Sequence, residues 1–277
     1  RPLLVAHTCS KTAEKRMAIT GLTPRHLTDL VPEVPLTEAR KIVAAVHRGG
    51  QLGAPVREVR RVSVEAVRER FEIPTLALRA RKASAVDPFV KYLFEAGDGR
   101  LLETVRIPLE RPGRFTACVS SQIGCALACD FCATGRLGLI RNLETWEIVE
   151  QVRVVKSELT RDQKMHGVVF QGMGEPLANL ERVLEAIRVL SEPSALAIDA
   201  RNITVCTSGL PTGIVRLAEE VPRVRLGLSI SSAIIEKRRR LMPIDKSHPL
   251  STVIDAVVFH AKKTGMSPMW AVTLLRG

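Results

Sequence analysis

The sequence predicts an α/β fold, in which a parallel sheet, curved or closed as a barrel, follows a small helical module. Two observations support this class. After residue 113, five short apolar segments alternate with helical patterns, and right-handed crossovers turn that order into a parallel sheet. Before residue 88, helical patterns dominate instead. With 277 residues, the chain can form one large domain and one small domain around a substantial core.

Residues 1–87 are predicted to form a helical accessory domain. Thr23 and Thr37 are suited to cap its first two helices, and Gly49-Gly50 ends the second. The segment holds 16 Lys and Arg against 9 Asp and Glu, which favours docking to RNA; a lid or packing domain is the alternative. The helices are expected at residues 22–30, 37–47 and 63–71.

Residues 88–113 are predicted to form a β-hairpin linker, with strands at 89–94 and 101–107 around the turn Gly97-Asp98-Gly99. Residues 114–277 then form the α/β core. Its strands are expected at 114–121, 167–171, 202–206, 224–230 and 269–275. Its helices are expected at 145–152, where Thr145 is suited to be the cap, and at 179–191, 213–221 and 250–264.

Composition and charge limit the functional classes. The 45% hydrophobic and 25% charged content is ordinary for a globular protein, and no run of about 18 apolar residues could span a membrane. The net charge of +12 favours a polyanionic partner, although a solvated basic surface without a partner is the alternative. One Tyr and two Trp argue against a broad stacking platform for single strands.

The start of the chain lacks a Met and lacks the layout of a secretory signal, so we expect a trimmed or incomplete beginning. Clustered cysteines in an enzyme-sized chain without an export signal predict metal binding in a reducing compartment, the cytoplasm, rather than disulfides.

Polar segments follow the predicted strands and should meet at one end of the sheet, where α/β folds place function. They are the cysteine-rich loop after the first strand, Gly174-Glu175-Pro176, Thr207-Ser208-Gly209 and Ser229-Ile230-Ser231-Ser232. The glycines let a backbone approach a ligand closely, and the Glu175 carboxylate can bind an ammonium group.

Four of the six cysteines lie within fifteen residues, from Cys118 to Cys132. The last three, Cys125, Cys129 and Cys132, have the spacing C-x3-C-x2-C. Three thiolates are one short of a closed zinc site and one short of an electron-transfer cubane. A cubane held by three thiolates leaves one iron free for a small molecule. Half of a zinc site completed by a remote residue, and chance, remain alternatives.

The C-x3-C-x2-C triplet is typical of the radical S-adenosylmethionine (SAM) enzymes, which this chain resembles. The resemblance implies a [4Fe-4S] cluster on Cys125, Cys129 and Cys132. It also implies that SAM chelates the open iron and is split to a 5′-deoxyadenosyl radical. Gly174 and Glu175 would then bind SAM.

A narrower resemblance is to the rRNA adenine-C2 methyltransferases of the RlmN/Cfr type. Four segments carry it over residues 88–277: Cys118-Val119-Ser120-Ser121-Gln122, Gly172-Met173-Gly174-Glu175-Pro176-Leu177, Thr207-Ser208-Gly209 and Leu241-Met242-Pro243-Ile244. The resemblance implies a partial (βα)6 barrel, incomplete here with about five strands, and an N-terminal accessory domain used for RNA. It further implies methylation of an adenosine in large-subunit rRNA with tRNA as a second candidate substrate, an electron donor such as a flavodoxin, and a monomer.

In the mechanism that the resemblance implies, one SAM methylates a cysteine near the C-terminus and a second SAM yields the radical. Cys118 matches the cysteine that helps to release the product, and Glu103 matches a carboxylate near the substrate. Their structural alternatives are a buried cysteine that packs as a small apolar residue and an exposed strand Glu.

Several positions depart from that family. Cys206 stands where a SAM-contacting Ser is usual, and Ser231 stands where a His is usual, while Ser229 keeps a polar group at the same strand end. The chain stops at Gly277, before the expected sixth strand and methyl-carrying cysteine, and Cys9 does not match that cysteine. We therefore expect an incomplete chain. Two alternatives remain: a diverged radical SAM enzyme with another substrate, and an iron–sulfur RNA-binding protein without turnover.

Overall fold

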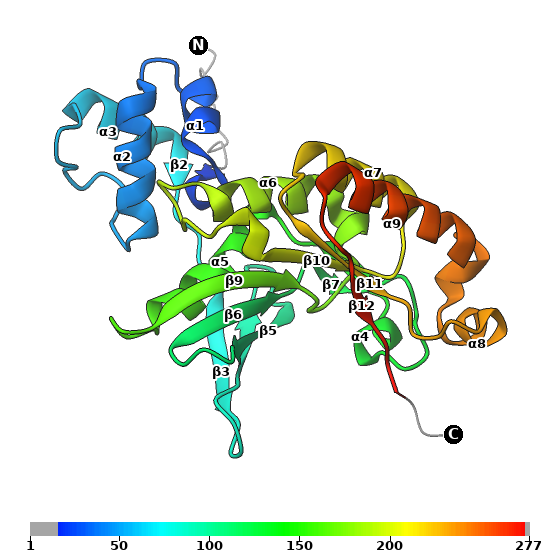
Figure 1. Cartoon of the computed structure of the whole chain (residues 1–277). Helices are drawn as coiled ribbons and strands as arrows, with labels where there is room; N and C mark the ends of the chain where they lie inside the picture. The colour runs from blue at the N-terminus through cyan, green and yellow to red at the C-terminus, as the bar shows by residue number, and fades with distance from the viewer. Residues whose placement is uncertain (1–15, 275–277) are drawn as a thin grey trace, which may run out of the picture.

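The computed structural model describes residues 16–274 of the chain (Figure 1). Its helices are α1 (Pro24–Leu30), α2 (Leu36–His47), α3 (Arg61–Arg70), α4 (Ala133–Arg136), α5 (Thr145–Ser157), α6 (Leu180–Ser191), α7 (Pro211–Glu220), α8 (Ile235–Leu241) and α9 (Leu250–Thr264). Its strands are β1 (Met17–Ala18), β2 (Phe71–Glu72), β3 (Ala77–Ala83), β4 (Val90–Glu95), β5 (Leu101–Pro108), β6 (Arg114–Val119), β7 (Gln122–Gly124), β8 (Leu139–Asn142), β9 (Lys164–Phe170), β10 (Ile203–Thr207), β11 (Arg225–Ser229) and β12 (Met269–Ala271).

One sheet of eight strands organises the core, in the order β12-β11-β10-β9-β6-β5-β4-β3. The strands β6, β9, β10, β11 and β12 are parallel neighbours, which confirms the five predicted strands and the α/β class. β5, β4 and β3 continue the sheet as antiparallel strands. Within the described residues the sheet is open, with β12 and β3 as its edges, as expected of a partial barrel.

Helices α5, α6, α7 and α9 cover one face of this sheet (Figure 1). In β6, the side chains of Phe115, Ala117 and Val119 are buried towards these helices, because alternate residues of a strand point to the same face. Arg114, Thr116 and Cys118 point to the opposite face and are only partly buried. We call that second face the open face.

The N-terminal module has its own small core, formed by α1–α3 around residues such as Leu27, Val43 and Phe71. Thr23 caps α1 as predicted, since its Oγ1 accepts a hydrogen bond of 3.3 Å from the N–H of His26. The prediction that Thr37 caps α2 is wrong. That helix begins one residue earlier, at Leu36, because the carbonyl of Pro35 already accepts the first helical hydrogen bonds.

The prediction that Thr145 caps helix α5 is also wrong. Its N-cap is Glu144 rather than Thr145, and the carboxylate of Glu147 accepts a 2.8 Å hydrogen bond from the N–H of Glu144. A carboxylate in the first turn is as predicted, but the capping position lies one residue earlier.

The predicted hairpin is confirmed as β4 and β5, whose turn has Gly99 at φ +77°. Strand β3 was missed, although it lies within the segment predicted to be helical. Its seven residues, Ala77 to Ala83, are all exposed, so no alternation of apolar and polar residues marks them as a strand. The boundary predicted at residue 87 falls between two paired strands, and the division into domains stays a prediction.

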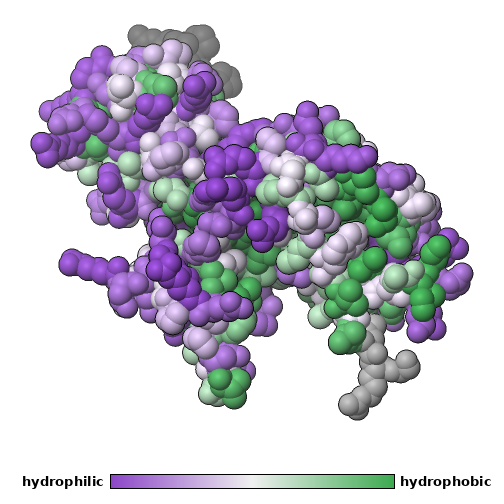
Figure 2. Space-filling model, viewed as in Figure 1, coloured by the Kyte–Doolittle hydropathy of each residue, from purple (hydrophilic) through white to green (hydrophobic). Residues whose placement is uncertain are grey.

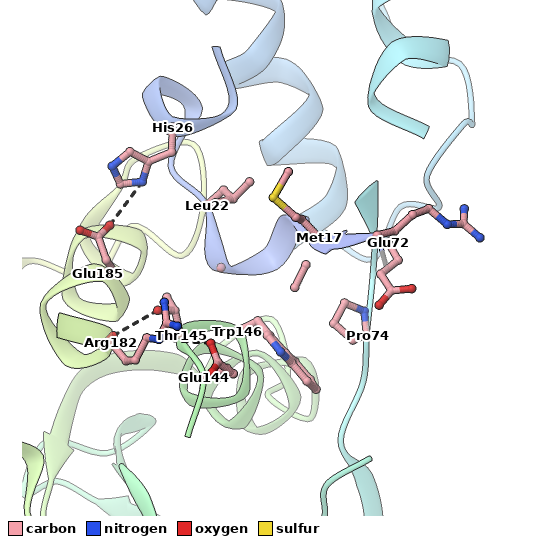
Figure 3. A pocket seen from close by; sticks show the side chains of 13 residues that line it. Met17, Leu22, His26, Glu72, Pro74, Glu144, Thr145, Trp146, Arg182 and Glu185 are labelled. Atoms are coloured by element: carbon pink, nitrogen blue, oxygen red, sulfur yellow. Dashed lines mark hydrogen bonds and ion pairs between the residues drawn. The ribbon is translucent and has the colours of Figure 1, made fainter. Parts of the chain in front are cut away.

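The N-terminal module lies against α5 and α6, with a cavity of about 360 Å³ between them (Figure 3). Its wall includes the ion pair of His26 Nδ1 with Glu185 Oε2, at 3.3 Å, and the pair of Arg182 with Glu144, at 3.2 Å. None of the residues that the sequence indicates as functional lines this cavity.

Surface character differs across the molecule. Figure 2 shows hydrophilic residues over much of the N-terminal module, whereas exposed apolar side chains such as Ile235, Phe259 and Trp270 belong to α8, α9 and β12. Among the described helices, none combines the length and the apolar character that crossing a membrane requires.

His47 at the end of α2 should make stability depend on pH. Its ring is buried, and neither ring nitrogen has a hydrogen-bond partner among residues 16–274. Burial together with the charges of Arg153 and Lys156 lowers its pKa to about 4. The unfolded chain, with a His pKa near 6.5, therefore binds more protons than the folded chain between pH 4 and 6.5. Stability is then lost as the pH falls through this window.

We expect this group to lower the free energy of unfolding by about 2 kcal/mol between pH 7 and pH 5. Urea titrations at both pH values measure it. His47→Phe and His47→Gln should both show a smaller loss than the wild type, and an unchanged loss in both variants would contradict the assignment.

Candidate active site

A cavity of about 290 Å³ lies at the C-terminal ends of the parallel strands. It is the place where the polar segments were predicted to meet. The predicted site residues that line it are Cys125, Cys129, Cys132, Gly174, Glu175, Cys206 and Ser229.

The cysteine loop is closed by the β7–β8 ribbon. Gly124 has φ +76°, and a Cβ there would lie 1.8 Å from the carbonyl oxygen of Gly138. Only glycine permits this close approach of the two backbone segments. Because of it, the N–H of Cys125, the next residue, donates a 2.9 Å hydrogen bond to the carbonyl of Gly138. At the far end of the loop, the N–H of Cys132 donates to the carbonyl of Cys129 at 3.0 Å. The loop that carries the three cysteines is thus closed at its base by the pairing of β7 with β8.

The three loop thiols influence one another. Burial, followed by the charges of Cys125 and Cys132, raises the pKa of Cys129 to about 11, and burial also raises the pKa of Cys125. Thiolates held together in this way need positive charge beside them, which iron ions supply. The described cysteines are all free thiols. This donor set of three soft ligands on one cavity fits a [4Fe-4S] cluster.

Cys206 lines the same cavity but does not belong to the loop set. Burial raises its pKa to about 12, and the next contribution comes from Cys118 rather than from a loop cysteine. Across residues 16–274, no three His, Cys, Asp or Glu side chains converge as ligands of a single metal ion. A [4Fe-4S] cluster does not require such convergence, because each thiolate binds a different iron.

Glu175 lies at the junction of two strand ends. Its Oε1 accepts from the N–H of Leu177 at 3.1 Å and its Oε2 from the N–H of Ser208 at 2.9 Å. Burial raises the pKa of this carboxyl group, and hydrogen bonds from backbone N–H groups partly offset that rise. A buried carboxylate on a cavity attracts a cationic group such as the SAM ammonium. Gly174, with φ +98°, permits the turn that brings it there.

Two buried amides join the end of β6 to its neighbours. Gln122 Oε1 accepts from the N–H of Glu175 at 2.8 Å, and Gln151 Oε1 accepts from the N–H of Ser120 at 2.8 Å and from Thr104 Oγ1 at 2.7 Å. In the sequence, Ser120-Ser121-Gln122 belong to a segment that resembles the RlmN/Cfr family, which did not predict this network. Three polar residues directly after a buried strand were a usable signal for this network.

Arg238 was missed entirely. Its side chain is fully buried on α8, where Nε donates to Asp245 at 3.0 Å. The two terminal nitrogens donate to the carbonyls of Ser208 at 2.8 Å and Ile230 at 2.7 Å, at the ends of β10 and β11. The same segment reaches the cysteine loop, because the Leu241 carbonyl accepts from the N–H of Asp130 at 3.0 Å. Within a run of four basic residues, nothing in the sequence distinguishes Arg238.

Three predicted residues do not line the cavity. Cys118 lies on the open face of β6, where burial raises its pKa to about 11. Glu103 lies on the same face of β5, with its side chain 45% exposed and paired at 3.2 Å with Lys91. Ser231 is buried just beyond β11, with φ +57° and with no hydrogen-bond partner for Oγ among the described residues. Their roles stay predictions.

Comparison with known proteins agrees with this geometry. The radical SAM superfamily model matches residues 119–273. A relative from Sorangium cellulosum (strain So ce56), named "Probable RNA methyltransferase sce3898", is 63% identical over 247 residues, which cover 87% of this chain and 63% of the relative. A relative from Thermotoga sp. (strain RQ2), named "Probable dual-specificity RNA methyltransferase RlmN", is 40% identical over 76% of this chain and 60% of the relative.

Among solved structures, the chain is similar to a radical SAM methyltransferase from Sphaerobacter thermophilus. The TM-score is 0.82 and the identity 32%, over 92% of this chain and 75% of that chain. Fold and cysteine loop together define a radical SAM protein. More particularly, the chain belongs to the RlmN-like family within the radical SAM superfamily, as the sequence predicted. It spans 63% of the length of the relative from Sorangium.

Gly174 should tolerate no side chain. A Cβ there would lie 2.5 Å from the Cβ of Gln122, at a φ that L residues rarely adopt. We expect Gly174→Ala to lower the free energy of unfolding by more than about 2 kcal/mol, measured in urea. The matched control is Gly97→Ala, with nothing within 4 Å, which should change it by less than about 0.5 kcal/mol. Equal effects of the two variants would refute the argument.

Arg238→Met should destabilise the chain by about 3–5 kcal/mol, because it leaves the Asp245 carboxylate buried without its counter-charge. Arg239→Met is the control: its side chain is 55% exposed and 3.6 Å from Asp245, so we expect less than about 1 kcal/mol. The double variant Arg238→Met/Asp245→Leu should recover part of the loss. Urea unfolding measures all three, and a loss that is similar for Arg238→Met and Arg239→Met would contradict the role.

Proposed function

We propose that this protein is a radical SAM methyltransferase that acts on the C2 carbon of an adenosine in large-subunit rRNA. The observation that carries the proposal is the single cavity lined by the three loop thiols and the buried carboxylate of Glu175. The names of the relatives support RNA as the substrate, and the net charge of +12 agrees with it.

Each site residue receives a role. Cys125, Cys129 and Cys132 hold a [4Fe-4S] cluster, and Glu175 accepts the ammonium group of SAM. When bound, cluster and SAM supply a 5′-deoxyadenosyl radical. Gly174 keeps the backbone close to SAM. Further contacts to SAM come from Cys206 and Ser229, which line the cavity, and from Ser231 beside it.

The substrate adenosine approaches from the open face. Cys118 lies there on β6, paired with Val105 of β5, and Glu103 is the next residue of β5 on that face. This arrangement supports a role of Cys118 in product release and of Glu103 as a proton acceptor. The N-terminal module docks the RNA, with tRNA as a second substrate. The protein works as a monomer in the cytoplasm, with a flavodoxin-like electron donor.

Cys206 favours one second candidate, a diverged radical SAM enzyme with another substrate. Its thiol lies where a Cβ on Gly227 would be only 2.8 Å away, so this part of the cavity is closely filled. A thiol is a weaker hydrogen-bond donor than a hydroxyl, which changes how SAM is held.

Anaerobic reconstitution of the full-length protein tests the proposal. We expect about four irons per chain, 5′-deoxyadenosine from SAM and a reductant, and C2-methyladenosine in rRNA by mass spectrometry. Cys129→Ala should lose all three. Cys118→Ala should keep the iron and lose the methylated product. Gly97→Ala, in the turn between β4 and β5 with nothing within 4 Å of the added carbon, serves as the control that keeps all three.

The outcomes separate the candidates. Bound zinc, or no iron, refutes the cluster. Iron without 5′-deoxyadenosine indicates an RNA-binding protein without turnover. Formation of 5′-deoxyadenosine, with rRNA from cells lacking the gene unchanged in its methylation, indicates a different substrate.

A further inference from the structure

A second cavity, of about 330 Å³, lies at the end of the sheet opposite the cysteine loop. Arg114 and Lys164, the first residues of β6 and β9, are paired neighbours in the sheet and both line it. Arg111, His166 and Asn202 line it as well. These residues have no part in the proposed cluster site, SAM site or reaction site.

These cationic side chains lack partners. Within residues 16–274, Arg111, Arg114 and Lys164 form no ion pair and no side-chain hydrogen bond. The carboxylate that lines the cavity, Asp199, does not offset them, because it already binds Arg201 at 2.6 Å and Arg223 at 3.2 Å. The cavity is therefore electropositive.

The positive charge of Lys164 also affects a neighbouring lysine, Lys156. Burial and the positive charge of Lys164 lower the pKa of Lys156 on α5, whose Nζ donates to the carbonyl of Leu196 at 3.0 Å. Cations that raise each other's energy in this way are stabilised when an anion binds between them.

The cavity also lies in line with the proposed reaction site. Arg114 and Cys118 are on the same face of β6, the open face, and four residues of strand separate them by about 13 Å. That distance corresponds to roughly four base steps of rise along the axis of a helical nucleic acid. A polynucleotide that places its target base near Cys118 can therefore reach the cavity with its backbone.

The geometry points to a phosphate-binding site formed by Arg111, Arg114, Lys164 and the side-chain amide of Asn202. Guanidinium groups bind phosphate oxygens in pairs, and an ammonium adds a point charge, so a phosphate group satisfies this set of donors. The phosphate comes either from the RNA backbone or from a small phosphorylated molecule. In the RNA case, the inference rests on the proposed function.

Salt-dependent binding tests the RNA source. We expect Arg114→Gln/Lys164→Gln to weaken binding of in vitro transcribed large-subunit rRNA. The slope of log K against log salt should become shallower by about 1 to 2, because fewer counterions are released. The control is Lys262→Gln/Lys263→Gln, which removes the same charge from two exposed residues at the end of α9 and should keep the wild-type slope.

Thermal unfolding with inorganic phosphate tests the small-molecule source. The wild-type Tm should rise with phosphate, and the Tm of the double variant should not. If the double variant fails to fold, Arg111→Gln, which changes one exposed residue, takes its place in both arms.

A shallower slope with no effect of phosphate on the Tm assigns the site to the RNA backbone. An effect of phosphate with an unchanged slope assigns it to a small phosphorylated molecule. If neither changes, the cluster is only a solvated basic surface and the inference is wrong. Production of 5′-deoxyadenosine without RNA is measured separately, so failure of this site and failure of the proposed function remain distinguishable.

Discussion

The close approach of two backbone segments, residues 120–122 after β6 and residues 172–175 after β9, is the constraint on which the site depends. A Cβ on Gly172 would lie 2.7 Å from the Val119 carbonyl, so only a glycine lets the strand ends meet. Ser120 Oγ then receives the N–H of Met173 at 2.9 Å, and Gln122 receives that of Glu175. These groups are buried, so each unmade hydrogen bond would cost about 1–3 kcal/mol. The cysteine loop and the Glu175 carboxylate are thereby fixed to each other.

The two faces of the sheet differ in the side chains that they carry. The face under α5, α6, α7 and α9 contains the main hydrophobic core, and burial of that apolar surface supplies most of the folding free energy. The open face bears the thiol of Cys118 and the charged side chains of Glu103 and Arg114. Alternate residues of one strand point to opposite faces. Packing of the core side chains on one face therefore fixes the positions of the polar side chains on the open face.

Elements marked by a pattern of apolar residues were predictable from the sequence, whereas the contacts of single polar residues were not. The five parallel strands were predictable because each is a short apolar run between turn signals. Strand β3 was not, because an exposed edge strand needs no apolar alternation. The loop cysteines and Glu175 were predictable from spacing and strand position. Arg238 was not, because its burial depends on α8 packing over the ends of β10 and β11, which no local pattern encodes.

Ion pairs cancel part of the basic charge of the chain locally and leave other cations uncompensated. On the helical face, arginines are paired with carboxylates: Arg216 bonds Glu181 and Glu220, and Arg188 bonds Glu220 at 2.9 Å, which ties α6 to α7. Such exposed pairs contribute little stability each, but they cancel the charge locally. Arg114 of β6 and Lys164 of β9, the neighbouring first residues of their strands, have no such carboxylate partner among the described residues. Arg114 lies on the same face of β6 as Cys118, so its uncompensated charge is available to a polyanion on that face, in contrast to the paired arginines of the helices.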